Sequence, residues 1–220
     1  MISGNSREIE SSQVGVHDNL AKLVNRHLLH PTQKPYNQHT LEAFQEVQEW
    51  LGDWRGKLIL DSCCGVGEST AVIAQQHPEA KIIGVDKSAV RTNKHGHYAA
   101  SSDNYRVIRA DLNDFWRLAI AAKWQLFKHY LLYPNPYPKT SQLHKRWHAS
   151  AAFADIIKLG GQLEVRSNWQ IYIQEFAAAL KIAEIDCQAK PYSAELAITP
   201  FERKYWASGQ SSWRLIAQLS

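Results

Sequence analysis

The sequence of 220 residues predicts an α/β fold with a mostly parallel central sheet and helices packed on both faces. Short apolar runs of strand length alternate with segments of helical periodicity along most of the chain. Three of the apolar runs end in an aspartate, and the first is followed by a glycine-rich turn. In a parallel sheet these strand ends lie at one edge, so we expect a ligand site there.

The chain begins with a polar stretch, residues 1–17, which lacks periodicity and which we interpret as a mobile tail. Helical patterns follow at residues 18–29 and 40–51, and Thr40 is placed to cap the second. These patterns form an N-terminal helical part, residues 18–55, in front of a Rossmann-like core, residues 56–220. No linker or repeat divides the two parts, so residues 18–220 are expected to form a single domain.

Within the core, six segments have the length and composition of strands. They are residues 57–61, 81–86, 105–111, 127–134, 162–168 and 211–219. Four segments between them have helical character, namely residues 68–77, 113–124, 150–159 and 171–183. This alternation predicts a parallel sheet with crossover helices on both faces.

The bulk composition excludes few functions. A net charge of +4 permits a polyanionic partner without demanding one. Cys63 and Cys64 are adjacent and Cys187 stands alone, so we expect a reducing, cytoplasmic location and no disulfide framework. No second Cys or His pair lies at ligand spacing from the vicinal cysteines, so we expect no metal site. The N-terminus has no signal pattern and no apolar run spans a bilayer, so no membrane association is expected.

A glycine turn and three acids mark the expected ligand site. Asp61, Asp86 and Asp111 follow the first three strands of the core, and Gly65 and Gly67 form the first turn. The dinucleotide motif G-x-G-x-x-G fails, because a threonine occupies the third glycine position, and no P-loop G-K-[ST] is present. The ordered set matches the class-I methyltransferases that bind S-adenosylmethionine, a Rossmann-like fold that closes with an antiparallel C-terminal strand.

The segment YPNPYPKTSQLHKRW, residues 133–147, follows the fourth core strand. Its three prolines fix φ and restrict the residues before them, so we expect Asn135 and Tyr137 to be held extended at the edge of the pocket. Tyr137 is placed to stack on a base, and Lys145 and Arg146 to meet phosphates.

This segment resembles the P-D-P-W-x-K segment of the bacterial tRNA (guanine-N7) methyltransferase family. DSCCGVGEST resembles the E-x-G-x-G-x-G-E-S loop of that family, and RSNWQIYIQEF resembles its T-D-W-x-x-Y segment. TPFERKYWASGQSSWRL is similar to its T-x-F-E segment with the strand that follows. The resemblance extends from about Leu58 to the C-terminus.

The resemblance implies roles for individual residues. Asn135 stands where the family has its catalytic-site aspartate. The site for S-adenosylmethionine would be lined by Asp61, Cys63, Gly65, Gly67, Asp86, Lys87, Asp111, Leu112 and Asn135. The substrate nucleotide would contact Lys139, Asn168, Thr199, Pro200, Phe201 and Glu202. RNA phosphates would contact Lys145 and Arg146.

The chain departs from the family pattern at three of these positions. Cys63 replaces the first glycine, and Asn135 and Asn168 replace acids. Methylation at N7 of guanine needs no general base, because N7 carries a lone pair and no proton. We therefore expect the amides to lower activity without abolishing it.

Three functions stay open from the sequence. They are a tRNA guanine-N7 methyltransferase, a methyltransferase acting on another acceptor, and a non-catalytic homologue that binds RNA or a partner. The N-P-Y-P run is similar to the N-P-P-Y motif used to methylate exocyclic amines, with the second proline displaced. For the first function we expect tRNA as the partner and a monomer or weak homodimer.

Overall fold

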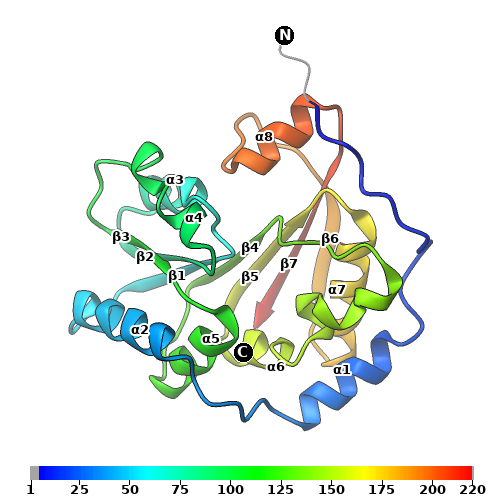
Figure 1. Cartoon of the computed structure of the whole chain (residues 1–220), viewed down its shortest axis with the longest axis horizontal. Helices are drawn as coiled ribbons and strands as arrows, with labels where there is room; N and C mark the ends of the chain where they lie inside the picture. Colours follow the sequence, from blue (N-terminus) through cyan, green and yellow to red (C-terminus); the bar gives the residue numbers. More distant parts are fainter. Residues whose placement is uncertain (1–4, 220) are drawn as a thin grey trace.

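The structure, a computed structural model, describes residues 5–219 of the chain. Seven strands form one mixed sheet in the order β3-β2-β1-β4-β5-β7-β6 (Figure 1). The first five strands are parallel, and β7 runs antiparallel to both of its neighbours. The strands are β1 (Lys57–Ser62), β2 (Ala80–Asp86), β3 (Tyr105–Arg109), β4 (Lys128–Leu132), β5 (Gly161–Ser167), β6 (Cys187–Tyr192) and β7 (Ser212–Leu219). This topology confirms the predicted fold class, including the antiparallel closing strand.

Eight α-helices connect and precede these strands within the described residues. They are α1 (Leu20–Leu29), α2 (Gln38–Leu51), α3 (Glu68–Gln76), α4 (Ala89–Thr92), α5 (Leu112–Ala121), α6 (Phe153–Lys158), α7 (Gln170–Ile182) and α8 (Pro200–Ala207). Three short 3₁₀ turns, η1 (His95–His97), η2 (Thr140–Lys145) and η3 (Trp147–Ala149), lie in the connections after β2 and β4. None of the described helices is long and apolar enough to cross a membrane.

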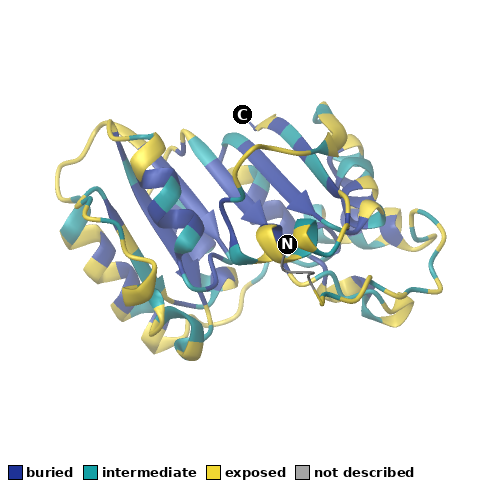
Figure 2. Cartoon of the chain, turned by 90° about the horizontal axis from the view of Figure 1, so that it is seen from above, coloured by how far each residue is buried: buried dark blue, intermediate teal, exposed yellow. Residues whose placement is uncertain are grey.

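The two faces of the sheet bury two separate cores. Side chains alternate along each strand, so Leu58 and Leu60 of β1 face one core while Ile59 faces the other. The larger core packs α1, α2, α5, α6 and α7 against the sheet, and the smaller core packs α3. Figure 2 shows the strands buried at the centre and the outer faces of the helices exposed. Burial of these apolar side chains is the main stabilising contribution to the fold.

The order of the strands creates the crevice in which the candidate site lies. β1 pairs with β2 on one side and with β4 on the other. The chain moves outward from β1 to β2 and β3, then returns to β4, so the connections after β1 and β4 leave in opposite directions. A crevice opens outside the carboxyl ends of strands at such a switch point.

The described part of the N-terminal stretch lies along the domain without forming a helix or strand. The backbone amide of Ser6 donates to Oγ of Ser208 at 3.0 Å. Nε2 of Gln210 donates to the carbonyl of Ser6 at 3.0 Å. Residues 5–17 are therefore tied to the C-terminal part of the fold, in contrast to the mobile tail expected from their polarity.

The sequence prediction missed three elements, α4, β6 and α8. β6 is an edge strand that pairs only with β7, and most of its residues are exposed. Its sequence CQAKPY therefore lacks the apolar run or the alternation that marks a half-buried strand. The residue pattern of α8 was assigned to substrate binding instead of to a helix start.

Candidate active site

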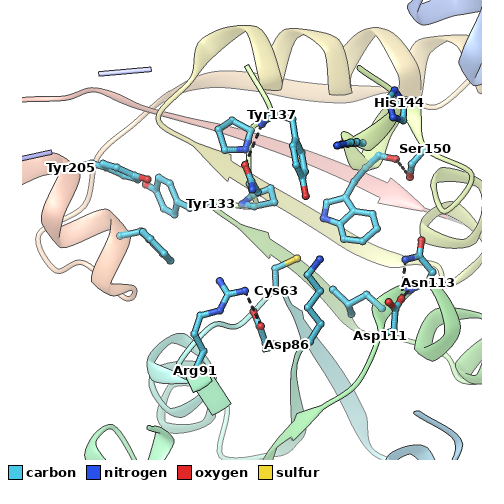
Figure 3. A pocket seen from close by; sticks show the side chains of 18 residues that line it. Cys63, Asp86, Arg91, Asp111, Asn113, Tyr133, Tyr137, His144, Ser150 and Tyr205 are labelled. Carbon is cyan, nitrogen blue, oxygen red and sulfur yellow. Dashed lines mark hydrogen bonds and ion pairs between the residues drawn. The ribbon is translucent and has the colours of Figure 1, made fainter. Parts of the chain in front are cut away.

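A pocket of about 580 Å³ lies outside the carboxyl ends of β1, β2 and β4 (Figure 3). Its volume is within the range of pockets that bind small ligands and cofactors. Eight of the residues predicted from the sequence line it: Cys63, Asp86, Lys87, Asp111, Leu112, Asn135, Lys145 and Phe201. The pocket thus combines residues that were expected for the cofactor, the base and RNA.

The turn after β1 forms the floor of the pocket and has an unusual backbone. Cys63, Gly65 and Gly67 all adopt positive φ, at 63°, 62° and 75°. A Cβ at Gly67 would lie 2.6 Å from Nδ1 of His95, whereas a Cβ at Gly65 would meet nothing within 4 Å. Gly67 is therefore required by packing, and Gly65 leaves open space beside the backbone. Gly67 itself does not line the pocket.

Asp86, at the end of β2, is 3% exposed and already has several partners. Its Oδ2 accepts a hydrogen bond from the amide of Gly65 at 3.1 Å. Its Oδ1 accepts from the amide of Ser88 at 2.8 Å and pairs with Nη2 of Arg91 at 3.0 Å. A carboxylate has about four acceptor sites, so one remains for a ligand hydroxyl.

Asp111 caps the N-terminus of α5 and is only half-buried. Its Oδ1 accepts from the amide and the side chain of Asn113, at 2.9 and 2.8 Å. Its own amide donates to Oγ1 of Thr40 in α2 at 3.1 Å, which ties the pocket to the N-terminal helices. Oδ2 of Asp111 makes no hydrogen bond with residues 5–219, so it can accept one from a ligand.

We call residues 133–139 the acceptor loop, and its residues 133–137 form the wall opposite Asp86 (Figure 3). Tyr133 and Tyr137 have φ of 51° and 47°, so the expectation of an extended Tyr137 is wrong. Oδ1 of Asn135 accepts a hydrogen bond from the amide of Tyr137 at 3.3 Å and closes a tight turn. This turn, more than the restriction by the prolines, sets the direction of the tyrosine. Positive φ at a non-glycine residue is strained and occurs often at functional sites.

Asp61 lies beneath the pocket and does not line it, although the sequence placed it among the cofactor ligands. It is fully buried, and its Oδ2 accepts hydrogen bonds from Ser69 Oγ at 2.6 Å and Thr70 Oγ1 at 2.7 Å. Burial raises its pKa to about 6, against the lowering effect of these two hydroxyls. Asp61 therefore anchors the glycine turn to the start of α3.

The cysteine at the pocket floor is chemically inert. Burial, together with the nearby carboxylates of Asp86 and Asp61, raises the pKa of the Cys63 thiol to about 12. The group stays protonated at neutral pH, which excludes a thiolate nucleophile. Cys63 thus acts as a small side chain in the position where the resembled family has glycine.

Thr199 and Glu202 shape the pocket from behind, and this corrects their predicted contact with the base. Thr199 Oγ1 accepts from the amide of Glu202 at 2.9 Å, an N-cap of α8. The Glu202 carboxylate is fully buried and accepts from Tyr133 Oη, Arg166 Nη1 and the amide of Ile198. With these partners and no exposure, it cannot accept hydrogen bonds from a guanine in this arrangement.

Arg146 requires a second correction. The sequence placed it against RNA phosphates, yet its side chain is 0% exposed and pairs with Glu175. Its neighbour Lys145 is exposed and lines the pocket. Direct phosphate contact by Arg146 is therefore wrong, and Lys145 alone of the pair faces solvent.

The remaining predicted residues lie outside the pocket lining. Lys139 is exposed, and the Asn168 side chain donates to Gln210 Oε1 at 2.9 Å. Gly65 lies in the turn after β1 with open space beside its backbone, and Pro200 occupies the first position of α8.

Tyr137, which the sequence places to stack on a base, also lines the pocket. Other lining residues were not predicted as ligands. They are Arg91, Asn113, Tyr133, Pro134, Pro136, His144, Trp147, Ser150 and Tyr205. A sequence signal existed for Tyr205, which lies four residues after Phe201 and so shares its face of a helix. No comparable signal marks Arg91, because its place depends on the turn that follows Asp86.

A sheet of this order, with a glycine turn after β1 and acids after β2 and β3 at one pocket, defines a class-I methyltransferase. The chain belongs to the family described as "Putative methyltransferase", whose model matches residues 55–215. The match covers the whole sheet except the last residues of β7.

Curated relatives share this region. The tRNA (guanine-N(7)-)-methyltransferase of Stutzerimonas stutzeri is 29% identical over 163 residues, which cover 69% of this chain and 68% of the relative. The tRNA (guanine-N(7)-)-methyltransferase of Shewanella oneidensis is 28% identical over 170 residues, which cover 72% of this chain and 71% of the relative.

Solved structures agree on the fold. The 16S rRNA methyltransferase KamB superposes with a TM-score of 0.58 at 15% identity, over 85% of this chain and 95% of that chain. The METTL16 methyltransferase domain gives a TM-score of 0.55 at 10% identity, over 92% and 94%. At these identities the likeness concerns the class-I methyltransferase fold alone.

Proposed function

We propose that this chain transfers the methyl group of S-adenosylmethionine to N7 of a guanine in tRNA. One observation carries the proposal. The strand-end acids Asp86 and Asp111 and the acceptor-loop residue Asn135 line the same pocket. The names of the curated relatives supply the acceptor, and the shared pocket supplies a place where donor and acceptor can meet.

The residues present fit the proposed cofactor. The free acceptor site of Asp86 suits ribose hydroxyls, and the free Oδ2 of Asp111 suits an amine donor of the adenine. The open space beside Gly65 lets a ligand approach the backbone closely. Lys87 and Leu112 extend the same wall.

S-adenosylmethionine supplies a methyl group on a positively charged sulfur. The N7 lone pair forms the new carbon–nitrogen bond, the carbon–sulfur bond breaks, and sulfur keeps the electron pair. No proton moves in this step, so the chain needs no general base at the site. Its residues align the base with the methyl group and exclude water.

The acceptor side of the pocket is aromatic and cationic. Tyr137, Phe201 and Tyr205 present ring faces on which a purine can stack, and Lys145 and His144 stand at its rim. The rings position the base, and the lysine attracts the phosphates of the polymer. Lys145 lies 5.9 Å above the ring of Tyr137, so the two functions are adjacent.

Asn135 determines how tightly the base is oriented. Its Oδ1 accepts the amide of Tyr137 with one of its two lone pairs, which leaves the second lone pair and Nδ2 for a ligand. Asn135 can therefore accept a hydrogen bond from a guanine N–H group or donate one to a ring acceptor.

The test is methyl transfer to unmodified bulk tRNA, with S-adenosylmethionine carrying an isotope-labelled methyl group, followed by mass spectrometry of the nucleosides. The expected product is labelled 7-methylguanosine, absent when Asp86→Asn replaces the native protein. Labelled N6-methyladenosine or another nucleoside would reassign the acceptor. No labelled nucleoside, together with no cofactor binding by calorimetry, would support a non-catalytic homologue.

A further inference from the structure

A buried ionic cluster lies directly behind the acceptor loop. Arg146, Glu175 and His148 are each 0% exposed. Nη1 of Arg146 lies 2.5 Å from Oε2 of Glu175, and Nε2 of His148 lies 2.9 Å from the same oxygen. Burying a charged pair has a large desolvation cost, and such pairs often fix one specific conformation. The question is which conformation this cluster fixes.

The guanidinium of Arg146 holds the backbone of the acceptor loop. Its Nε and Nη2 both donate to the carbonyl of Tyr137, at 3.1 and 3.0 Å. Nη2 also donates to the carbonyl of Lys139 at 3.4 Å. Tyr137 is the residue with φ of 47°, a strained conformation that persists only when the surroundings hold it. Two nitrogens of the planar guanidinium donate to the same carbonyl, a geometry that the single ammonium group of lysine cannot reproduce.

The N-terminal segment, residues 11–17, completes the same cluster. Oε1 of Gln13 accepts from Nη1 of Arg146 at 3.1 Å, and Nε2 of Gln13 donates to Oε1 of Glu175 at 2.5 Å. The amide of His17 donates to Oε1 of Glu175 at 3.1 Å. Oγ of Ser11 donates to the carbonyl of Pro138 at 2.7 Å, so the segment also touches the acceptor loop directly.

We propose that Arg146, Glu175 and residues 11–17 form a positioning scaffold that holds the acceptor loop in its strained conformation. None of the scaffold residues lines the pocket. It fixes the Tyr137 and Lys139 carbonyls, and through them the direction of Asn135 and Tyr137 in the pocket. The catalytic consequence rests on the proposed function, whereas the structural coupling between the two segments does not.

The scaffold role and an RNA-contact role predict different salt dependences of RNA binding once the positive charge of Arg146 is removed. Removing a cation that contacts a phosphate makes the decline of log affinity with log salt concentration less steep, by about 0.7 to 0.9 in slope. Lys145→Ala, the exposed neighbour, should show this loss. Arg146→Gln removes a positive charge that is 0% exposed, so it should leave the slope unchanged, while both Arg146→Gln and Arg146→Lys should loosen the loop.

The deciding experiment is hydrogen exchange measured by mass spectrometry on the full chain, with native protein, Arg146→Lys, Ser11→Ala and the control Lys145→Ala. Arg146→Lys should speed exchange about tenfold in residues 11–18, which are remote in sequence. Ser11→Ala should speed exchange in residues 139–146 to a similar extent. Lys145→Ala should change neither region.

Unchanged exchange in the partner region for both variants would overturn the proposal. So would a loss of salt dependence for Arg146→Gln that equals the loss for Lys145→Ala. If Arg146→Lys does not fold, the same exchange measurement on Ser11→Ala and Gln13→Ala decides the result, because both residues are only partly buried. The exchange readout needs no methyl transfer, so a failure of the proposed function stays distinguishable from a failure of the scaffold. With transfer established, Ser11→Ala should lower the single-turnover rate more than tRNA affinity.

Discussion

Gly65 and Gly67, both in the turn after β1, differ in what an added methyl group would contact. Alanine substitutions at the two positions therefore test stability and ligand binding separately. Gly67→Ala drives a Cβ to within 2.6 Å of His95 and 2.7 Å of Val107, at φ of 75°. We expect it to lower the free energy of unfolding by about 2 to 4 kcal/mol.

Gly65→Ala is the matched variant, because its Cβ meets no protein atom within 4 Å. It should cost only about 1 kcal/mol of stability from its positive φ. Its cofactor affinity should nevertheless fall at least about tenfold, because we propose that the cofactor approaches the turn through the open space beside Gly65, which the methyl group would enter. Chemical denaturation and titration calorimetry check the pair, and full cofactor affinity in Gly65→Ala would place the ligand elsewhere.

Asn135 is the residue at which the chain departs most from the family it resembles. Asn135→Asp keeps an oxygen for the amide of Tyr137 and presents a charged oxygen in place of Nδ2. A charged acceptor strengthens a hydrogen bond to guanine N–H groups by about 1 kcal/mol, so the single-turnover rate on tRNA should rise about fivefold. An unchanged or slower rate, measured beside Asn135→Ala, would count against this base orientation.

The buried carboxyl of Asp61 should make the stability of the fold depend on pH. Its pKa in the folded chain is about 6, raised by burial from 3.8. A raised carboxyl pKa means that the folded state binds the proton more tightly, so stability falls as the pH rises from about 4 to 6. The gap of about two pH units, each worth about 1.4 kcal/mol, corresponds to roughly 3 kcal/mol.

Asp61→Asn removes this titration while it keeps an acceptor for Ser69 and Thr70. The free energy of unfolding of Asp61→Asn, relative to that of the native protein, should therefore increase from pH 4 to pH 7. The neighbouring charged groups Asp86 and Arg166 are common to both proteins. Parallel pH profiles for the two proteins would refute the assignment.

At the scale of elements, α8 closes the side of the pocket that carries Phe201 and Tyr205. The helix depends on its N-cap, in which Thr199 accepts the amide of Glu202. Thr199→Ala should lower the free energy of unfolding by about 1 kcal/mol, and Thr199→Ser should restore most of it. Thermal denaturation checks the series, and equal stability of the three proteins would show that the cap contributes nothing.

The start of α8 was predictable from the sequence but was not recognised as a helix start. T-P-F-E has the pattern of a helix start, with an N-cap threonine, a proline in the first turn and a glutamate three residues after the cap. We interpreted it through a family resemblance and assigned Glu202 to the base. The periodic strands and long helices of the core were predictable because burial imposes their pattern.

The pocket itself was predictable only in part. Residues at strand ends, such as Asp86 and Asp111, follow from the sheet order, because parallel strands bring their carboxyl ends together. Arg146 could not be separated from Lys145 by composition, since the difference between them is a buried partner 29 residues away. The strained φ of Tyr137 likewise depends on that contact.

At the scale of the whole molecule, the site collects side chains from most of the chain, from Cys63 to Tyr205. The N-terminal stretch contributes from behind, through hydrogen bonds of Gln13 to Arg146 and Glu175. The net charge of +4 is small, so RNA affinity must depend on local cations around the pocket more than on the overall field.

The central claim is that one pocket holds the methyl donor against the acceptor loop. A crystal structure of the chain with S-adenosylhomocysteine tests it most directly. We predict ribose hydroxyls on Asp86, the adenine beside Asp111 and Leu112, and the sulfur facing Asn135. A ligand bound at another surface, such as the smaller hollow between Trp54 and Lys123, would contradict the account.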